Sequence, residues 1–172
     1  VIGSSVGFNI AEYTDFKNGL ETASQKYQET GGFPSSCNGA IPPGATYDCV
    51  QDLTGETLDN APVWTVSVFS DYEYPLPPMP EITLFTRIEY SFMSERYLDT
   101  DLDPNLLQDS THLLNLRLGA RIHPYWDWLN GFGREVEVTA WVRNVAQEKW
   151  AVVGFDVPTL NGFAIVNGPP RQ

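Results

Sequence analysis

The chain has 172 residues, with 22 acidic against 10 basic side chains and a formal charge of -12 at pH 7. Its 42% hydrophobic and 13% aromatic residues exclude a disordered acidic segment, and its length suits one domain. The acidic balance excludes nucleic acid as an expected partner, because phosphate binding needs a basic surface.

No uncharged apolar run is long enough for a transmembrane helix. The first residues, Val1 to Ser5, have no basic start of the kind that opens a signal peptide. We therefore expect the chain to be a segment of a longer polypeptide.

Five segments alternate with a period of two and predict an all-β fold of antiparallel amphipathic strands. In chain order they cover residues 3–16, 62–74, 82–97, 112–123 and 135–143. In the last four, one face has 19 apolar or aromatic residues in 21 positions and no charge: Trp64, Val66, Val68, Ser70, Tyr72, Tyr74, Ile82, Leu84, Thr86, Ile88, Tyr90, Phe92, Leu114, Leu116, Leu118, Ala120, Ile122, Val136, Val138, Ala140 and Val142. The opposite face has nine charged residues: Asp71, Glu73, Arg87, Glu89, Arg117, Arg121, Glu135, Glu137 and Arg143.

The connections between these segments alternate between long and short. Residues 17–61 form a long connection, residues 75–80 a proline-rich tight turn, and residues 98–111 and 124–134 a medium and a shorter loop. Alternating loop lengths are typical of outer-membrane β-barrels, and rings near strand ends suit the membrane interfaces. A soluble β-sandwich, which buries its apolar face against a second sheet, explains the same alternation. Five or six strands are too few to close a transmembrane barrel.

Several short motifs follow one another in a recognisable order. They are LDNAPVWT at 58–65, YLDTDLDP at 97–104, LNLRLG at 114–119 and VTAWVRN at 138–144, followed by DVP at 156–158, GFA at 162–164 and GPPR at 168–171. In this order the chain resembles the C-terminal β-barrel portion of TonB-dependent outer-membrane receptors. The resemblance covers nearly the whole chain.

The resemblance implies that residues 1–172 form about six strands of a 22-stranded transmembrane β-barrel, with a long extracellular loop at about 17–61. Such receptors lie in the outer membrane of Gram-negative bacteria and take up a scarce ligand of the siderophore, cobalamin or oligosaccharide class. The implied partners are outer-membrane lipid, the remainder of the barrel and its plug, and the TonB machinery. The sequence contains no plug and no TonB box. A truncated receptor-like accessory or structural subunit is therefore one alternative, and a soluble secreted β-sandwich binding module is another.

Aromatic side chains on the expected outer loops are the candidate ligand contacts. They are Tyr27, Phe33, Tyr47, Trp150 and Phe163. The same rings would also serve to pack the loops against one another. On the charged face we expect structural pairing, with Arg87 and Glu89, and Arg117 and Arg121, as members of one network.

Cys37 and Cys49 enclose 11 residues rich in glycine and proline, which predicts a disulfide. Closing such a loop contributes about 2–3 kcal/mol in the chain-entropy model. A zinc site is less favoured because it needs four ligands, and the two histidines, His112 and His123, belong to other segments.

Asp99, Asp101 and Asp103 alternate as at the start of a calcium-binding loop. The resemblance to an EF-hand then fails, because Pro104 replaces the required glycine and Ser110 the bidentate glutamate. We expect these acids to form a solvated surface loop, with calcium as a weak alternative. We expect no cofactor and no enzyme activity: the chain has no Gly-x-Ser-x-Gly elbow, and Glu135 and Glu137 suit a solvated strand face.

Overall fold

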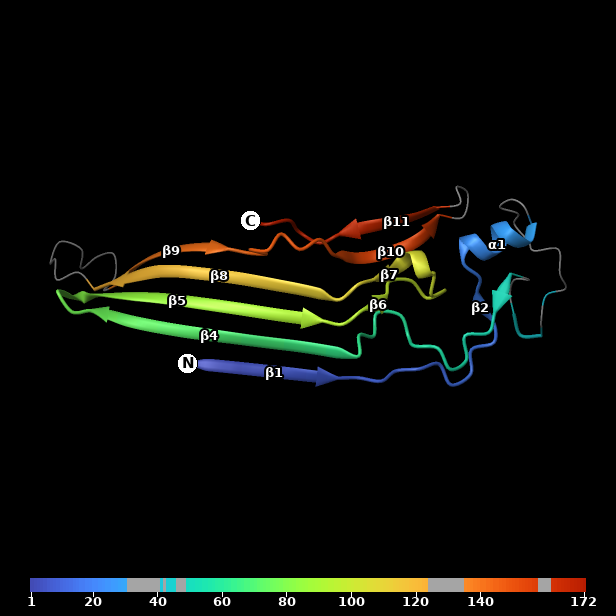
Figure 1. Ribbon diagram of the computed structural model, residues 1–172, viewed down its shortest axis with the longest axis horizontal. Helices are drawn as coiled ribbons and strands as arrows, with labels where there is room; N and C mark the ends of the chain where they lie inside the picture. The colour runs from blue at the N-terminus through green and yellow to red at the C-terminus, as the bar shows by residue number, and fades with distance from the viewer. Residues whose placement is uncertain (31–40, 42, 46–48, 124–134, 158–161) are drawn as a thin grey trace.

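The computed structural model describes residues 1–30, 41, 43–45, 49–123, 135–157 and 162–172. Its main element is an open sheet of five antiparallel strands in the order β1-β4-β5-β8-β9. The strands are β1 (Ile2–Phe8), β4 (Trp64–Leu76), β5 (Met79–Met93), β8 (Thr111–Ile122) and β9 (Val136–Val142). We call this element the long sheet. The predicted all-β, antiparallel architecture is confirmed, although the sheet has five strands and is not closed (Figure 1).

The register places the predicted apolar positions of neighbouring strands opposite one another. Tyr72 pairs with Thr86, Thr86 with Leu118, and Leu118 with Ala140. In β1 the alternation continues through Val6, which pairs with Val66. Because directly opposite residues share a face, the apolar positions of all five strands form one continuous surface. The predicted division of the strands into an apolar and a charged face is therefore correct.

The ends of the strands follow local chemistry. β4 and β5 meet at Pro77 and Pro78, and the register shifts beside Pro75, where the imino nitrogen has no proton to donate. The first predicted strand, 3–16, is too long: β1 ends at Phe8. The segment that precedes β4, the partner strand of β1, bends at Asn60, which has a φ of 51°. Beyond this bend only irregular hydrogen bonds join the two segments, such as Tyr13 N–H to the Glu56 carbonyl at 2.9 Å.

All other elements gather at one end of the long strands, at the right of Figure 1. They are β2 (Gly19–Leu20), α1 (Ala23–Thr30), β3 (Val50–Gln51), β6 (Arg96–Tyr97), η1 (Pro104–Leu106), β7 (Leu107–Gln108), β10 (Ala151–Val157) and β11 (Gly162–Asn167). β10 and β11 pair only with each other, so the tail forms a separate hairpin and adds no strand to the long sheet. We call these elements the loop cap.

The buried apolar residues lie in the loop cap. Leu98, Leu106 and Ala151 form its core cluster, and Ala23, Cys49, Leu53 and Leu102 are buried as well. Gly154 lets β10 pass close to this cluster, because a Cβ there would come within 2.7 Å of Leu106. In contrast, Thr111 is the single buried residue of the five long strands. The core thus lies beside the sheet and not against either of its faces.

Helix α1 begins with a capping box. The Thr22 N–H donates to Oε1 of Gln25 at 2.7 Å, and the Gln25 N–H donates to Oγ1 of Thr22 at 3.2 Å. None of the helices in the described ranges is long and apolar enough to cross a membrane.

Candidate functional site

The apolar face of the long sheet is exposed along its whole length. Leu118, at its centre, is 49% exposed. Each of the other strands also contributes exposed apolar side chains to this face: Ile2, Val6, Phe8, Trp64, Tyr72, Tyr74, Leu84, Ile88, Val136, Val138 and Val142. Within the described ranges no second sheet packs on this face. The exposed apolar surface is therefore continuous across the five strands, and extensive apolar surfaces mark contacts with another protein, a ligand or a membrane.

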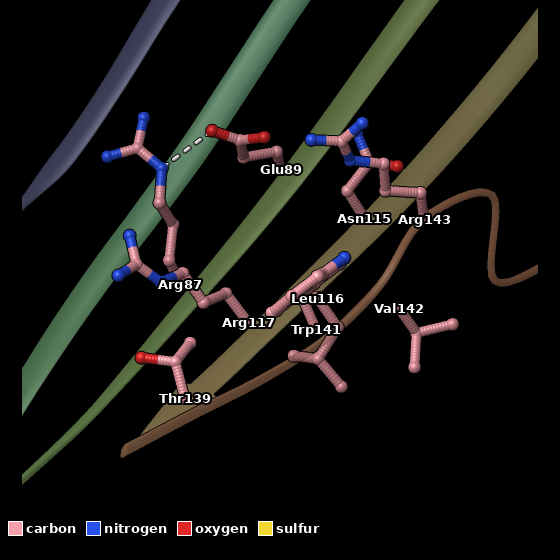
Figure 2. A pocket seen from close by; sticks show the side chains of 9 residues that line it. All are labelled: Arg87, Glu89, Asn115, Leu116, Arg117, Thr139, Trp141, Val142 and Arg143. Carbon is pink, nitrogen blue, oxygen red and sulfur yellow. Dashed lines mark hydrogen bonds and ion pairs between the residues drawn. The ribbon is translucent and has the colours of Figure 1, made fainter. Parts of the chain in front are cut away.

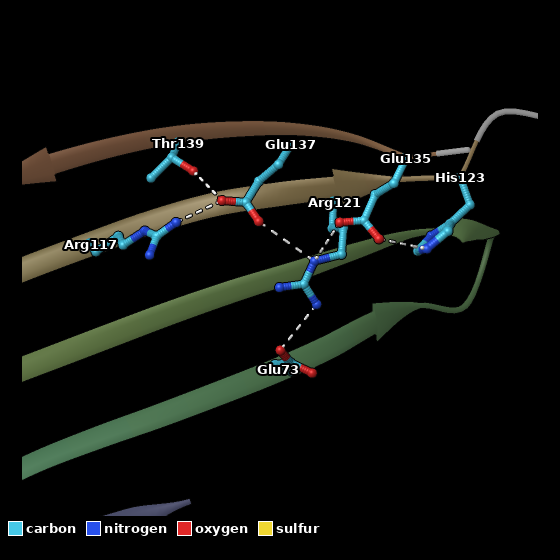
Figure 3. A network of polar contacts seen from close by, with 7 residues as sticks. All are labelled: Glu73, Arg117, Arg121, His123, Glu135, Glu137 and Thr139. Carbon is cyan, nitrogen blue, oxygen red and sulfur yellow. Dashed lines mark hydrogen bonds and ion pairs between the residues drawn. The ribbon is translucent and has the colours of Figure 1, made fainter. Parts of the chain in front are cut away.

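The opposite face has a connected ion-pair network, shown in Figure 3. The Arg121 guanidinium, on β8, lies 3.2 Å from Glu73 on β4, and 3.3 Å and 3.6 Å from Glu135 and Glu137. Glu137 also accepts from Arg117 at 2.6 Å and from the Thr139 hydroxyl at 3.0 Å. Glu137 therefore joins Arg117 to Arg121, which agrees with the predicted network, and Glu137 on β9 and Glu135 just before it are paired rather than simply solvated.

A second group of pairs centres on Arg87 of β5. Its guanidinium donates to both carboxylate oxygens of Asp71, at 3.2 Å and 3.0 Å, and to Glu89 at 2.6 Å. The predicted pairing of Arg87 with Glu89 is thus confirmed. Arg87, Arg117 and Arg121 therefore each meet an acid from a neighbouring strand.

Two phenylalanines on the charged face lie between glycines and arginines. The Phe85 ring covers Gly119, where a Cβ would overlap the ring, and Arg117 and Arg121 both lie 5.3 Å from the ring centroid. Phe69 covers Gly3 in the same way, with Arg87 at 4.7 Å. The glycines are required for this close approach, and the rings hold the arginines by cation–π contact.

Beside these pairs the charged face is hollowed by an open cavity of about 510 Å³, lined by Arg87, Glu89, Asn115, Leu116, Arg117, Thr139, Trp141, Val142 and Arg143 (Figure 2). Trp141 is 60% exposed here. The described residues supply no ion-pair partner for Arg143, in contrast to Arg87 and Arg117. The cavity therefore presents an indole ring and one unpaired guanidinium.

The aspartates of the YLDTDLDP segment do not form the expected solvated loop. Asp101 and Asp103 are 6% and 2% exposed, because their carboxylates accept hydrogen bonds from the turn itself. Asp101 accepts from the Asp103 N–H at 3.2 Å, and Asp103 from the Asn105 N–H at 2.8 Å. No three side chains of metal-ligand type come together among the described residues in a way that would hold a metal ion. The calcium alternative therefore gains no support.

Asp156 of β10, which the sequence analysis named only as part of the DVP motif, joins this group. Its N–H donates to Asp99 at 3.2 Å, and its Oδ2 accepts from the Ala23 N–H at the start of α1. Burial, followed by the Asp156 charge, raises the pKa of Asp101 to about 7. Burial also raises the pKa of Asp156. Sequence spacing could not reveal this group, since 55 residues separate the two aspartates.

Two of the candidate ligand contacts lie on separate elements of the loop cap, and Trp150 lies just before β10. Tyr27 on α1 and Phe163 on β11 are exposed, whereas Trp150 is half-buried and its ring lies against Gly168. Phe33 and Tyr47 lie outside the described residues. The structure does not bring the three described rings together into one site.

Cys49 is buried and disulfide-bonded, in agreement with the predicted bridge, and Cys37 lies outside the described residues.

Comparisons with known protein families, with curated proteins and with solved structures give no match for this chain. Fold and site define it as an antiparallel β-protein whose open sheet has one apolar and one ion-paired face, with a compact loop cap at one end.

Proposed function

We propose that the chain is the C-terminal part of a TonB-dependent β-barrel receptor in the outer membrane of a Gram-negative bacterium. The continuous, exposed apolar face of the long sheet is the observation that carries this proposal. Lipid would cover such a face, and the ion-paired face would line the barrel interior.

Strand length supports a membrane barrel over a β-sandwich. β4, β5 and β8 have 13, 15 and 12 residues, whereas strands of globular sheets have about 5–6 and a tilted transmembrane strand needs about 9–11. Strands of this length cross the hydrocarbon core and extend beyond it. A sandwich would also need a second sheet on the apolar face, and the described residues supply none.

Rings on the apolar face lie near both ends of the strands. Phe8 and Trp64 contact each other at 4.5 Å near the loop cap, and Phe92 lies against His112 at 5.0 Å. Tyr72 and Tyr74 lie toward the opposite end of β4. The step from Trp64 to Tyr74 covers about 33 Å along the strand, or about 25 Å along the normal of a membrane at a tilt of about 40°, which matches the apolar band of outer-membrane barrels.

The open edges support incorporation into a larger sheet. β1 and β9 each have one neighbour in the long sheet, and unpaired edge amides are costly in lipid. The remainder of the barrel would pair with these edges, and the plug would face the ion-paired side. The loop cap would then lie outside the cell, where it would help to bind a siderophore, cobalamin or oligosaccharide.

Spin labels at neighbouring positions of β9 test the lipid-facing assignment. Val138 lies on the apolar face and Thr139 on the charged face, so single Val138→Cys and Thr139→Cys variants of the full polypeptide form a matched pair. In liposomes, we expect the label at 138 to be relaxed by oxygen and that at 139 by a water-soluble nickel complex. Equal access of the nickel complex to both labels would refute the lipid-facing sheet.

The transport part of the proposal has a separate test. The mass of the denatured polypeptide from its native source should be several times that of 172 residues, since plug and remaining strands must be present. A mass close to that of this segment alone would contradict autonomous transport. It would favour the accessory or structural subunit, because the open edges would then need another chain.

A further inference from the structure

Asp101 and Asp156 lie at a junction in the loop cap, where β3, β10 and the start of α1 meet the loop between β6 and η1. Asp101 belongs to the loop between β6 and η1, Asp156 to β10, and the N–H of Ala23 at the start of α1 donates to Asp156 Oδ2. From β3, Gln51 donates to the Asp101 carbonyl oxygen at 2.7 Å. The carboxyl groups of Asp101 and Asp156 lie within hydrogen-bonding reach of each other.

One oxygen at this junction lacks a donor. Oδ1 of Asp156 is buried, and no amide, hydroxyl or basic group in the described ranges donates a hydrogen bond to it. Leaving a buried carboxylate oxygen without a donor destabilises the state in which it is buried. A proton on the Asp101 carboxyl would supply the missing donor.

The charges that face this pair are negative. Asp99 acts on both carboxyl groups, Asp103 acts on Asp156, and each member of the pair acts on the other. From α1 comes the peptide N–H of Ala23, and Glu21, which precedes the helix, is buried as well. Gln51 from β3 is uncharged. With 6% of Asp101 exposed, water does little to stabilise a second negative charge.

We propose that a proton shared between Asp101 and Asp156 is a pH-sensitive clamp, which fastens β10 and the start of α1 to the 98–106 loop. The clamp holds the loop cap closed at mildly acidic pH and releases it as the proton is lost around neutral pH. This proposal is independent of the function proposed above, since it concerns contacts within the loop cap alone.

The sign of the effect follows from linkage. The pKa of Asp101 is about 7 in the closed cap, above its ordinary value of 3.8, so the closed state binds the extra proton between these two values. The free energy of opening therefore falls as pH rises from about 4 to about 7 and then levels off. Between pH 5.5 and 8.5 the open population should rise about thirtyfold.

Hydrogen–deuterium exchange of the full polypeptide in detergent micelles tests the clamp. Peptides covering 98–106 and 151–157 report on the junction, and peptides from β4 and β5 report on the long sheet. The Asp101→Asn variant keeps a donor toward Asp156 but cannot titrate. Comparing the wild type and this variant at each pH removes the intrinsic pH dependence of amide exchange.

We expect exchange at the junction to be at least about tenfold faster in the wild type than in Asp101→Asn at pH 8.5, and similar in both at pH 5.5. Asp156→Asn should reduce the pH response, because it removes the Asp156 charge and leaves only burial and Asp99 to raise the pKa of Asp101. This variant covers the case in which Asp101→Asn does not fold. Asp109→Asn, at an exposed acid between β7 and β8, should behave as the wild type. Identical pH responses in the wild type and in a folded Asp101→Asn or Asp156→Asn variant would overturn the proposal.

Discussion

The long sheet and the loop cap use the same chain in opposite ways. In the loop cap, Leu106 is 1% exposed, and it packs with Leu98 and Ala151 in the core cluster. In the long sheet, Leu118 is 49% exposed although it lies at the centre of an apolar face. The cap therefore makes its own core, whereas the sheet presents its apolar side chains to whatever surrounds it.

The two regions therefore differ in where their apolar side chains find contacts. Burial of the cap removes apolar surface from water within the protein, which is the usual source of stability. The sheet gains no such burial from the described residues, and its regularity comes from the strand pairing and the ion pairs of its charged face. Mutations in the two regions should therefore change the free energy of unfolding by different amounts, and this change should depend differently on whether the protein is in lipid, detergent or water.

The largest expected effect is a cavity in the cap. Leu106→Ala should lower the free energy of unfolding by about 2–5 kcal/mol, because its neighbours cannot close the space fully. Leu118→Ala should cost about 1 kcal/mol, since half of that side chain has no protein neighbour. Denaturant titration in detergent micelles measures both. Equal costs would mean that Leu118 is packed in the complete protein, which would remove the contrast.

A charge on the apolar face should come next. Leu118→Arg should destabilise the protein in lipid by about 2–4 kcal/mol, the cost of an arginine facing the middle of a bilayer. Thr139→Arg is the matched control, because Thr139 pairs with Gly119, the neighbour of Leu118, and lies on the charged face near Glu137. Unfolding in lipid vesicles measures the difference. Tolerance of Leu118→Arg would indicate that this face meets water.

A methyl group at Gly119 should have a smaller effect. Its Cβ would overlap the Phe85 ring and come within 2.6 Å of the Val138 carbonyl oxygen. We expect Gly119→Ala to cost about 1–3 kcal/mol, as is usual for overpacking. Adding Phe85→Leu should restore part of the loss in a double-mutant cycle. If Phe85→Leu only lowers the stability further, the placement of the Phe85 ring does not depend on Gly119.

Much of the long sheet follows from the sequence, because a period-two pattern fixes both the strand and its faces. The predicted apolar and charged faces correspond to the observed register from Trp64 to Val142. The end of β1 was predicted too late, since alternation of side chains does not report the left-handed turn of the partner segment at Asn60.

The loop cap was much less predictable. Helix α1 is short and has few apolar residues, and the spacing of Thr22 and Gln25 in its capping box was a local signal for it. The meeting of Asp101 with Asp156 depends on how β10 returns over the 98–106 loop. Tertiary contacts between distant segments determine both the burial of these acids and their pKa, so a local pattern of alternating aspartates suggested a solvated loop instead.

The smallest expected effect concerns the ion-pair network. It distinguishes ion pairs between residues of the long sheet from ion pairs between the sheet and other parts of the protein. Arg121→Gln removes the partner of Glu73, Glu135 and Glu137, but these groups are partly exposed and screened by salt, so the loss should be several-fold smaller than that of Leu106→Ala. Melting at low and at high salt measures it: the wild type should lose stability with salt, and the variant should lose less.

Arg143→Gln is the control, since Arg143 has no ion-pair partner among the described residues. Its salt response should match the wild type when the sheet accounts for all of the pairing. A loss of salt dependence at Arg143 equal to that at Arg121 would show that the guanidinium meets a carboxylate outside the described residues. The cavity beside Trp141 would then be the place where a further part of the polypeptide contacts the charged face.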